Sequence, residues 1–454
     1  MSEQAAEAPY DVAVLGAGAA GLMAAIRAAE LGARVILLEK NRKTGVKILM
    51  SGGTRCNITN ARGLRNRSVV TGPADPLYDP REARGAASIM AAFGPGGPFL
   101  RPALKAFSVE QSVSFFEAEG VATKIEGNGK VFPVSDRSVD VLEALLRRLE
   151  RSGATLKTLS PVQSLEDSGN DAQRYFRVRT NDHEILAKNV ILAMGGQSFP
   201  GSGTTGDGFA IARRFGHTII DPKPALVPLR VAPEWVSDLR GITIPDVIAR
   251  VVDASERTLS ERREAILFAH FGLTGPAILD VSGAVARNDR PAELSLRIDF
   301  APDLTEPKLN DDLAQRARQG RPLVANLLPE FLPRRLAEAL ITHAGVPAGR
   351  LGPELTRDER QRIVAAVKRL SLPITGTLGF AKAEVTCGGV SLEEVNPETL
   401  ESLLKPGLFL CGEVLDLDGR IGGYNFQAAW STGWLAGQIA AKPFQPSAHP
   451  SLTV

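Results

Sequence analysis

The stretch Val12-Ala-Val-Leu-Gly-Ala-Gly-Ala-Ala-Gly-Leu22 carries the strongest fold signal in the chain. An apolar strand pattern, Tyr10 to Leu15, runs into a Gly-x-Gly-x-x-Gly turn, and a helical pattern, Gly21 to Leu31, follows. In such a turn the first glycine allows a tight bend, the second lets the backbone approach a pyrophosphate, and the third lets the helix pack closely on the strand. The helix N-terminus adds free N–H groups aimed at the phosphates. The stretch therefore predicts a dinucleotide-binding turn.

A second apolar strand, Ala33 to Glu39, completes a β-α-β unit and ends in an acid. A carboxylate at this place accepts both hydroxyls of an adenosine ribose, which favours a ribose without a 2′-phosphate. We therefore expect FAD or NAD rather than NADP at this site, although Lys40, Arg42 and Lys43 follow closely.

Composition narrows the class of protein. The chain has 454 residues, of which 44% are hydrophobic and 23% are charged, as in ordinary globular proteins with more than one domain. Because 53 Lys+Arg nearly balance 51 Asp+Glu, the sequence gives no electrostatic reason to expect a nucleic-acid partner. The three cysteines lie far apart and fit a reducing compartment. We expect a cytoplasmic protein without a membrane span.

Glycine is frequent, and its informative members gather in four clusters, at residues 16–21, 52–53, 195–208 and 412–423. In the last cluster, Gly412-Glu413 ends a strand pattern with an acid that suits the hydroxyls of a ribityl chain. Further on, Gly422-Gly423 opens a helix whose N-terminus would stabilise negative charge on a reduced flavin ring. An NAD enzyme needs no such second helix, so the C-terminal region favours FAD.

The pattern of elements predicts an interrupted domain. Between about residues 220 and 372 the sequence predicts strands interrupted by prolines and then helices. After residue 372, glycine-rich strands and turns like those of the first third are again predicted. We predict an FAD-binding domain in two parts, residues 1–220 and 373–454. Between them we predict an insert that consists of a β-rich domain, residues 221–304, and a helical subdomain, residues 305–372. Ser138 is expected to cap one helix, and Thr356 with Glu359 to form a capping box on another.

Over nearly its whole length the chain resembles the BaiN/RdsA-type, aminoacetone-oxidase-like FAD-binding oxidoreductases of bacteria. The motifs that carry the resemblance are Gly16-Ala-Gly-Ala-Ala-Gly21, Lys47-Ile-Leu-Met-Ser-Gly-Gly-Thr-Arg-Cys-Asn-Ile-Thr-Asn60, Gly195-Gly-Gln-Ser-Phe-Pro200, Thr205-Gly-Asp-Gly208, His270-Phe-Gly-Leu-Thr-Gly-Pro276, Glu384-Val-Thr-Cys-Gly-Gly-Val390, Gly412-Glu-Val-Leu-Asp416 and Gly422-Gly-Tyr-Asn425. The resemblance implies an α/β fold: a glutathione-reductase-type FAD-binding Rossmann domain with an inserted β-barrel-like domain that carries a helical subdomain.

The predicted FAD contacts come from several distant parts of the chain. The resemblance places the segment from Ser51 to Asn57 along the flavin, with Thr54 where the family more often has a third glycine, and Arg55 can neutralise pyrophosphate there. The full predicted set is Gly16, Gly18, Ala19, Ala20, Gly21, Glu39, Lys40, Lys47, Ser51, Gly52, Gly53, Thr54, Arg55, Cys56, Asn57, Val162, Gly195, Gly206, Asp207, Gly412, Glu413, Gly422, Gly423, Tyr424 and Asn425.

A second literal Gly-x-Gly-x-x-Gly pattern lies at Gly201-Ser-Gly-Thr-Thr-Gly206. No β-α-β unit ending in an acid follows it, so it does not predict a second dinucleotide site. The overlapping Thr205-Gly-Asp-Gly208 resembles a segment that lies by the flavin in fumarate-reductase-like flavoproteins, and we assign it to FAD. NAD(P)H, if it is the transient electron donor, must then bind without a Rossmann domain of its own.

The sequence does not assign a catalytic residue, and the candidates are His270, Arg55 and Tyr424. His270 is either a structural histidine or a group that faces the substrate or donates a proton. Cys56 beside a flavin invites a redox role, but we favour a small buried residue, and we expect the other two cysteines to be structural. No Ser-His-Asp, P-loop or metal-ligand constellation is apparent, so hydrolase and kinase chemistry are not expected.

The predicted activity is that of an FAD-dependent oxidoreductase with hydride transfer through the flavin N5. The resemblance implies NAD(P)H-linked reduction of an activated C=C bond in a small organic substrate. Within redox chemistry the alternative is an oxygen-using oxidase of a small amine or amino ketone. From another class, the alternative is a non-redox FAD-binding or RNA-modifying protein. The sequence gives no oligomeric state.

Overall fold

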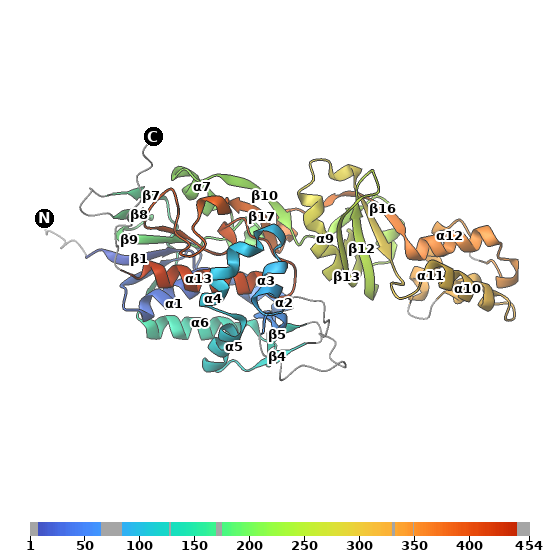
Figure 1. Cartoon of the computed structure of the whole chain (residues 1–454), viewed down its shortest axis with the longest axis horizontal. Helices are drawn as coiled ribbons and strands as arrows, with labels where there is room; N and C mark the ends of the chain where they lie inside the picture. The colour runs from blue at the N-terminus through green and yellow to red at the C-terminus, as the bar shows by residue number, and fades with distance from the viewer. Residues whose placement is uncertain are drawn as a thin grey trace. The chain divides into compact units, whose positions relative to one another are not determined.

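The computed structural model describes residues 8–64, 84–126, 129–168, 175–328, 332–347 and 349–442. The chain divides into two compact units, unit 1 with residues 1–222 and 386–454, and unit 2 with residues 223–385. Strand β10 (Ile219–Ala225) leads out of unit 1 and β17 (Val385–Val390) leads back into it; the two pair in a two-stranded sheet (Figure 1).

Unit 1 is built on a seven-stranded sheet of order β6-β2-β1-β9-β8-β7, with β18 also beside β9. Five of the strands are parallel, β1 (Tyr10–Leu15), β2 (Val35–Leu38), β6 (Thr155–Lys157), β9 (Glu184–Leu192) and β18 (Leu408–Leu410). The antiparallel pair β7 (Ser164–Asp167) and β8 (Phe176–Arg179) extends the sheet. The carboxyl ends of β1, β2, β9 and β18 therefore meet at one edge, and the segments after them carry the glycine clusters and Glu39.

Two helices far apart in sequence, α1 (Ala19–Glu30) and α13 (Tyr424–Ala440), pack side by side in unit 1 (Figure 1). Gly433 and Gly437 make this possible, because a Cβ atom on either one would overlap the backbone carbonyl of Ala20 or Ala24. Trp430 is fully buried in the same core and its indole N–H donates to the carbonyl of Ile58 at 2.9 Å. The C-terminal helix therefore completes the N-terminal β-α-β unit.

The other elements of unit 1 surround this core. They are α2 (Val46–Thr54), β3 (Thr59–Asn60), α3 (Ala86–Ala91), α4 (Arg101–Ala106), α5 (Val109–Ala118), β4 (Thr123–Ile125), β5 (Lys130–Pro133), α6 (Ser138–Ser152) and α7 (Asp207–Arg214). The expected cap of α6 is wrong: Arg137 is the N-cap residue, and the Ser138 hydroxyl instead donates to the carbonyl of Leu49 at 2.8 Å.

Unit 2 contains a closed antiparallel barrel of order β11-β14-β13-β12-β15-β16. Its strands are β11 (Leu229–Val231), β12 (Thr243–Val252), β13 (Thr258–Ala269), β14 (Gly272–Thr274), β15 (Ser295–Asp299) and β16 (Leu370–Thr377). The boundary that we placed after residue 372 falls inside β16. Pro373 does not end this strand, because its carbonyl still accepts the Ala232 N–H at 2.9 Å.

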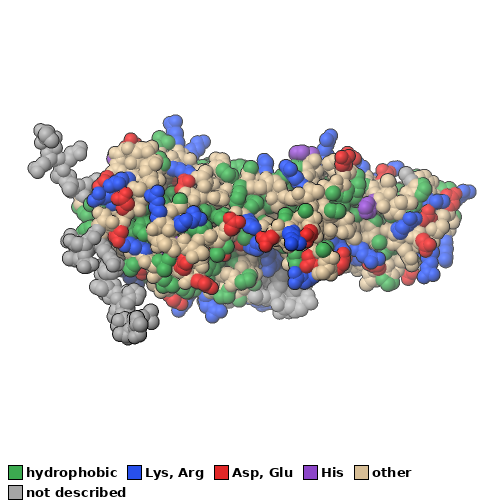
Figure 2. Space-filling view, turned by 90° about the horizontal axis from the view of Figure 1, so that it is seen from above, with side chains coloured by type: hydrophobic (Ala, Val, Ile, Leu, Met, Phe, Trp, Pro, Cys, Tyr) green, Lys and Arg blue, Asp and Glu red, His purple; other side chains and the backbone are tan. Residues whose placement is uncertain are grey.

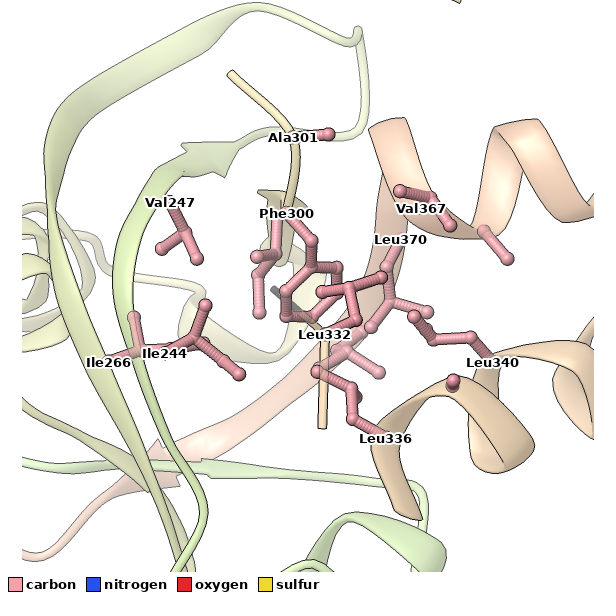
Figure 3. Packing of buried hydrophobic residues seen from close by; sticks show 14 of the residues in the cluster. Ile244, Val247, Ile266, Phe300, Ala301, Leu332, Leu336, Leu340, Val367 and Leu370 are labelled. Atoms are coloured by element: carbon pink, nitrogen blue, oxygen red, sulfur yellow. The ribbon is translucent and has the colours of Figure 1, made fainter. Parts of the chain in front are cut away.

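The helices of unit 2 are α8 (Trp235–Asp238), α9 (Pro276–Ala286), α10 (Glu306–Ala317), α11 (Arg334–His343) and α12 (Arg357–Lys368). The expected capping box of α12, Thr356 with Glu359, is present. Figure 3 shows Phe300 between barrel residues such as Val247 and helix residues such as Leu336, all in one buried cluster. The helices between β15 and β16 thus share a core with the barrel.

Candidate functional site

The glycine turn after β1 contains two glycines that the protein itself requires. Gly16 has a φ of +102°, and a Cβ atom there would lie 2.6 Å from the carbonyl oxygen of Ala193. A Cβ atom on Gly21 would overlap the carbonyl oxygen of Gly16. Gly18 differs, because its φ of −83° suits any residue and a Cβ atom there would meet no atom within 4 Å. The open face at Gly18 fits a bound pyrophosphate, which is what the fingerprint predicts.

The acid at the end of β2 is held toward this turn. Glu39 is 9% exposed, and its carboxylate accepts the N–H of Ala17 at 3.0 Å and that of Asn41 at 2.9 Å. The Ala17 bond fixes the carboxylate beside the turn, at the place where the fingerprint puts the adenosine ribose. Val162 lies in the neighbouring connection, where the N–H of Ser160 donates to the carbonyl of Glu39 at 2.9 Å.

The segment with the second Gly-x-Gly-x-x-Gly pattern packs against other parts of unit 1. Lys40 bonds both the Thr205 hydroxyl and the Asp207 carboxylate at 2.6 Å. A Cβ atom on Gly203 would overlap the Asn41 side chain, and one on Gly206 would lie 2.6 Å from that of Gln197. The chain itself therefore accounts for these two glycines. Asn41 and Thr205 were not among the residues selected from the sequence, although Thr205 lies in a quoted motif.

A polar network joins α2 to the segments after β9 and β18. The Lys47 ammonium lies 2.6 Å from the Glu413 carboxylate and donates to the Ser198 hydroxyl at 2.6 Å. Glu413 also accepts from the Ser198 hydroxyl at 2.7 Å and from the N–H of Thr386 at 2.7 Å. Three donors thus hold the acid that we expected to bind a ribityl chain. Ser198 and Thr386 were missed, although both lie inside motifs that the sequence singles out.

The segment after Lys47 has unusual backbone geometry. Gly52 and Gly53 have positive φ angles and break α2 into two parts. Thr54 has a φ of +69°, the conformation that glycine adopts without strain. The threonine at the family's third glycine position therefore keeps the glycine-like backbone.

The Arg55 side chain forms ion pairs with two carboxylates and stacks on an aromatic ring. Its guanidinium lies 2.6 Å from Glu126 and 3.4 Å from Asp136, and it stacks 4.0 Å from the centre of the Phe132 ring. The hydrogen bond to Glu126 raises the pKa of Arg55. The structure brings two carboxylates to this cation; neutralisation of a pyrophosphate by Arg55 stays a prediction.

The cysteines lie in buried positions. Cys56 is fully buried, and burial raises the pKa of its thiol to about 12. Burial also raises the pKa of Cys411, and Cys387 is buried as well. Since the thiolate is the reactive form, these environments favour structural roles for the cysteines.

The start of α13 faces residues that follow α2. Gly423 has a φ of +91°, and a Cβ atom there would lie 2.8 Å from the side-chain oxygen of Asn57, a buried atom that has no hydrogen-bond partner. Tyr424 is buried, and both ends of the Asn425 amide bond the backbone of Gly419 at 2.8 Å. Asn425 therefore shapes the loop before the helix.

His270 belongs to unit 2, whereas all the predicted FAD contacts belong to unit 1. It is exposed in the turn between β13 and β14, with its ring 4.9 Å from that of Phe271. Within the described ranges, no helix has the length and hydropathy to cross a membrane.

A dinucleotide turn on a parallel sheet, an acid at the second strand and a glycine-lined sheet edge are features of a dinucleotide-binding enzyme. The comparisons with known proteins support an FAD-dependent oxidoreductase. The chain belongs to the HI0933-like protein Rossmann domain family, which matches residues 10–72 and 82–439. The resemblance and the fold class inferred from the sequence are thus confirmed.

Two curated relatives are similar over almost their whole length. A 3-dehydro-bile acid delta(4,6)-reductase of Clostridium scindens is 32% identical over 95% of this chain and 99% of the relative. A ribosomal RNA dihydrouridine synthase of Escherichia coli is also 32% identical, over 95% and 99%. Among solved structures, a 3-ketosteroid-delta4-(5alpha)-dehydrogenase of Rhodococcus jostii has the same fold, with a TM-score of 0.53, 17% identity, and coverage of 97% of this chain and 99% of that one.

Proposed function

We propose that this chain uses FAD to reduce a C=C bond conjugated to a carbonyl group in a small organic substrate, with NAD(P)H as the electron donor. The observation that carries the proposal is the pair of names borne by its full-length relatives. A delta(4,6)-reductase acting on a 3-dehydro-bile acid and a dihydrouridine synthase both remove a C=C bond next to a carbonyl. The two names therefore share one chemistry, although their substrates differ.

The site supports a dinucleotide in an extended pose along the sheet edge. Glu39 at the end of β2 suits the adenosine ribose, and the open face at Gly18 with the N-terminus of α1 suits the pyrophosphate. Since β18 lies on the far side of β9 from β1, Glu413 and the Lys47 ammonium belong toward the flavin end. When bound, FAD supplies hydride transfer at N5. The chain supplies the binding surface for the dinucleotide and the Lys47 ammonium, which is paired with Glu413.

Anaerobic reduction separates the proposed reductase from an oxidase. NADH or NADPH should bleach the visible absorbance of the bound flavin, and a 4-en-3-one or 4,6-dien-3-one steroid should restore it. A saturated 3-ketone is the matched control and should not. Failure of both nicotinamide donors, together with peroxide release from small amines in air, would instead establish the amine oxidase.

An RNA base is the second candidate substrate, because two relatives are named ribosomal RNA dihydrouridine synthase. The uracil C=C bond is also conjugated to a carbonyl. Against it stands the charge distribution: Figure 2 shows Lys and Arg interspersed with Asp and Glu over the face in view, and the net charge is only +2. Loss of dihydrouridine from ribosomal RNA in a deletion strain would favour this candidate over a small molecule.

We place either activity in the cytoplasm, in keeping with three free thiols.

A further inference from the structure

The segment Gly201–Asp207, here called the return segment, follows β9 and comes back to the end of β2. Besides the two Lys40 bonds, the Asn41 side-chain amide donates to the carbonyl of Ser202 at 3.3 Å. Within the segment, the Thr205 hydroxyl donates to the other Asp207 oxygen at 2.8 Å. The return segment is therefore tied to the two residues that follow Glu39.

Lys40 occupies a position with a specific chemical meaning. Dinucleotide sites that accept a ribose 2′-phosphate place a cation near the end of the second strand, whereas sites for an unmodified ribose place an acid there. This chain has the acid, Glu39, and the cation, Lys40, side by side. What decides between them is whether the ammonium group is available to a phosphate.

In this structure the ammonium of Lys40 is neutralised. Asp207 lies 2.6 Å from it, with side chains 27% and 43% exposed for Lys40 and Asp207. Partial burial by itself would raise the pKa of the Asp207 carboxyl, but the hydrogen bonds from Lys40 and Thr205 outweigh it and lower that pKa below its usual value. The carboxylate is thus ionised at neutral pH and its charge cancels that of Lys40.

We propose that Asp207 is a specificity-determining residue of the dinucleotide site: by holding Lys40, it withdraws the cation that would otherwise bind a 2′-phosphate on the adenosine ribose. The inference rests on the proposed binding of FAD at the Gly16–Gly21 turn. It gives the return segment a role that its glycine pattern does not suggest, because the segment acts on the ribose end through Lys40.

The test compares two adenosine ligands on the full-length protein after removal of FAD. Calorimetry measures the affinities for ADP and for 2′,5′-ADP, and their ratio cancels general effects of a substitution on the site. In Asp207→Asn the ratio should shift toward 2′,5′-ADP by about tenfold, the scale of one added charge-assisted hydrogen bond. The gain should vanish in the double variant Lys40→Met/Asp207→Asn, although Arg42 and Lys43 are still present.

A matched control uses a lysine–carboxylate pair of unit 1 that lies outside the predicted FAD contacts, Lys188 with Asp11 at 2.7 Å. Asp11→Asn releases Lys188 without touching Lys40, so its ratio should equal that of the unchanged protein. A ratio that stays within about twofold in a folded Asp207→Asn protein that binds ADP would overturn the inference and leave the FAD proposal standing. If the unchanged protein binds neither ADP nor FAD, the proposed function itself fails. If Asp207→Asn does not fold, Asp207→Ser takes its place and the same ratio decides.

Discussion

Single residues of the glycine turn differ in why they are glycine. Gly16 and Gly21 are required by contacts inside the protein, so a side chain at either position disturbs the fold. Gly18 has open space around it and an ordinary φ, so no contact inside the protein requires a glycine there; we propose that the bound pyrophosphate does. Within six residues, the glycines that the fold requires can therefore be distinguished from the glycine that we assign to ligand binding.

The first prediction concerns Gly18→Val. We expect loss of FAD retention with little loss of stability, because the valine side chain would occupy only the space assigned to the pyrophosphate. The bound flavin per protein and the apo-protein melting temperature measure the two effects. Gly21→Val is the control and should unfold the domain. Retention of FAD with unchanged affinity in Gly18→Val would contradict the assignment.

The second prediction concerns pH. Burial lowers the pKa of His217, more than its contact with Glu394 raises it, so the folded protein keeps this ring neutral. Below the unfolded value of about 6.5, the unfolded chain gains a proton that the folded chain does not, so stability falls as pH falls.

His217→Gln should remove this part of the pH dependence. The buried His217 ring contacts the Ser402 hydroxyl at 2.8 Å and Glu394 at 3.2 Å, and glutamine keeps hydrogen-bonding capacity without a titrating ring. Urea midpoints at pH 7.5 and pH 5.5 provide the measurement. An equal loss of stability in both proteins over this range would show that other groups set the dependence.

At the scale of elements, the pairing of α1 with α13 depends on backbone contact. We predict that Gly437→Ala lowers the free energy of unfolding by about 2–3 kcal/mol, toward the upper end of the usual cost of forcing extra atoms into a packed core, because the new Cβ atom would overlap the carbonyl oxygen of Ala24. Gln438→Ala, on the same helix, removes only the 2.8 Å hydrogen bond to Arg27 and should cost about 1 kcal/mol. Chemical denaturation of both variants measures the difference, and equal costs would refute close backbone packing as the cause.

Elements with local signals could be predicted from the sequence, and contacts between distant elements could not. The glycine turn and the α12 capping box follow from a few adjacent residues. The partners of Arg55 and Glu413 come from other elements, and no local pattern names them. Ser138 shows the limit within one element, since its hydroxyl prefers a carbonyl from α2 to its own helix.

At the scale of the whole molecule, the insert leaves and re-enters unit 1 through paired strands. We predict that replacing residues 223–385 by a short Gly/Ser linker leaves FAD binding intact, because every predicted FAD contact lies in unit 1. If unit 2 takes part in the proposed reduction of a conjugated C=C bond, turnover should be lost while the flavin stays bound. Flavin content and anaerobic turnover measure the two outcomes. A folded but flavin-free product would show that unit 2 contributes to the cofactor site.

The pairing of α1 with α13 has a consequence for biosynthesis. Arg27 and Gln438 are hydrogen-bonded across 411 positions of sequence. At roughly 5–20 residues per second, the ribosome synthesises α13 tens of seconds after α1. During that time the alanine-rich side of α1 that packs against α13 is exposed. The nascent chain is therefore expected to need chaperone cover over its first helix, and the protein to acquire its cofactor only after release from the ribosome.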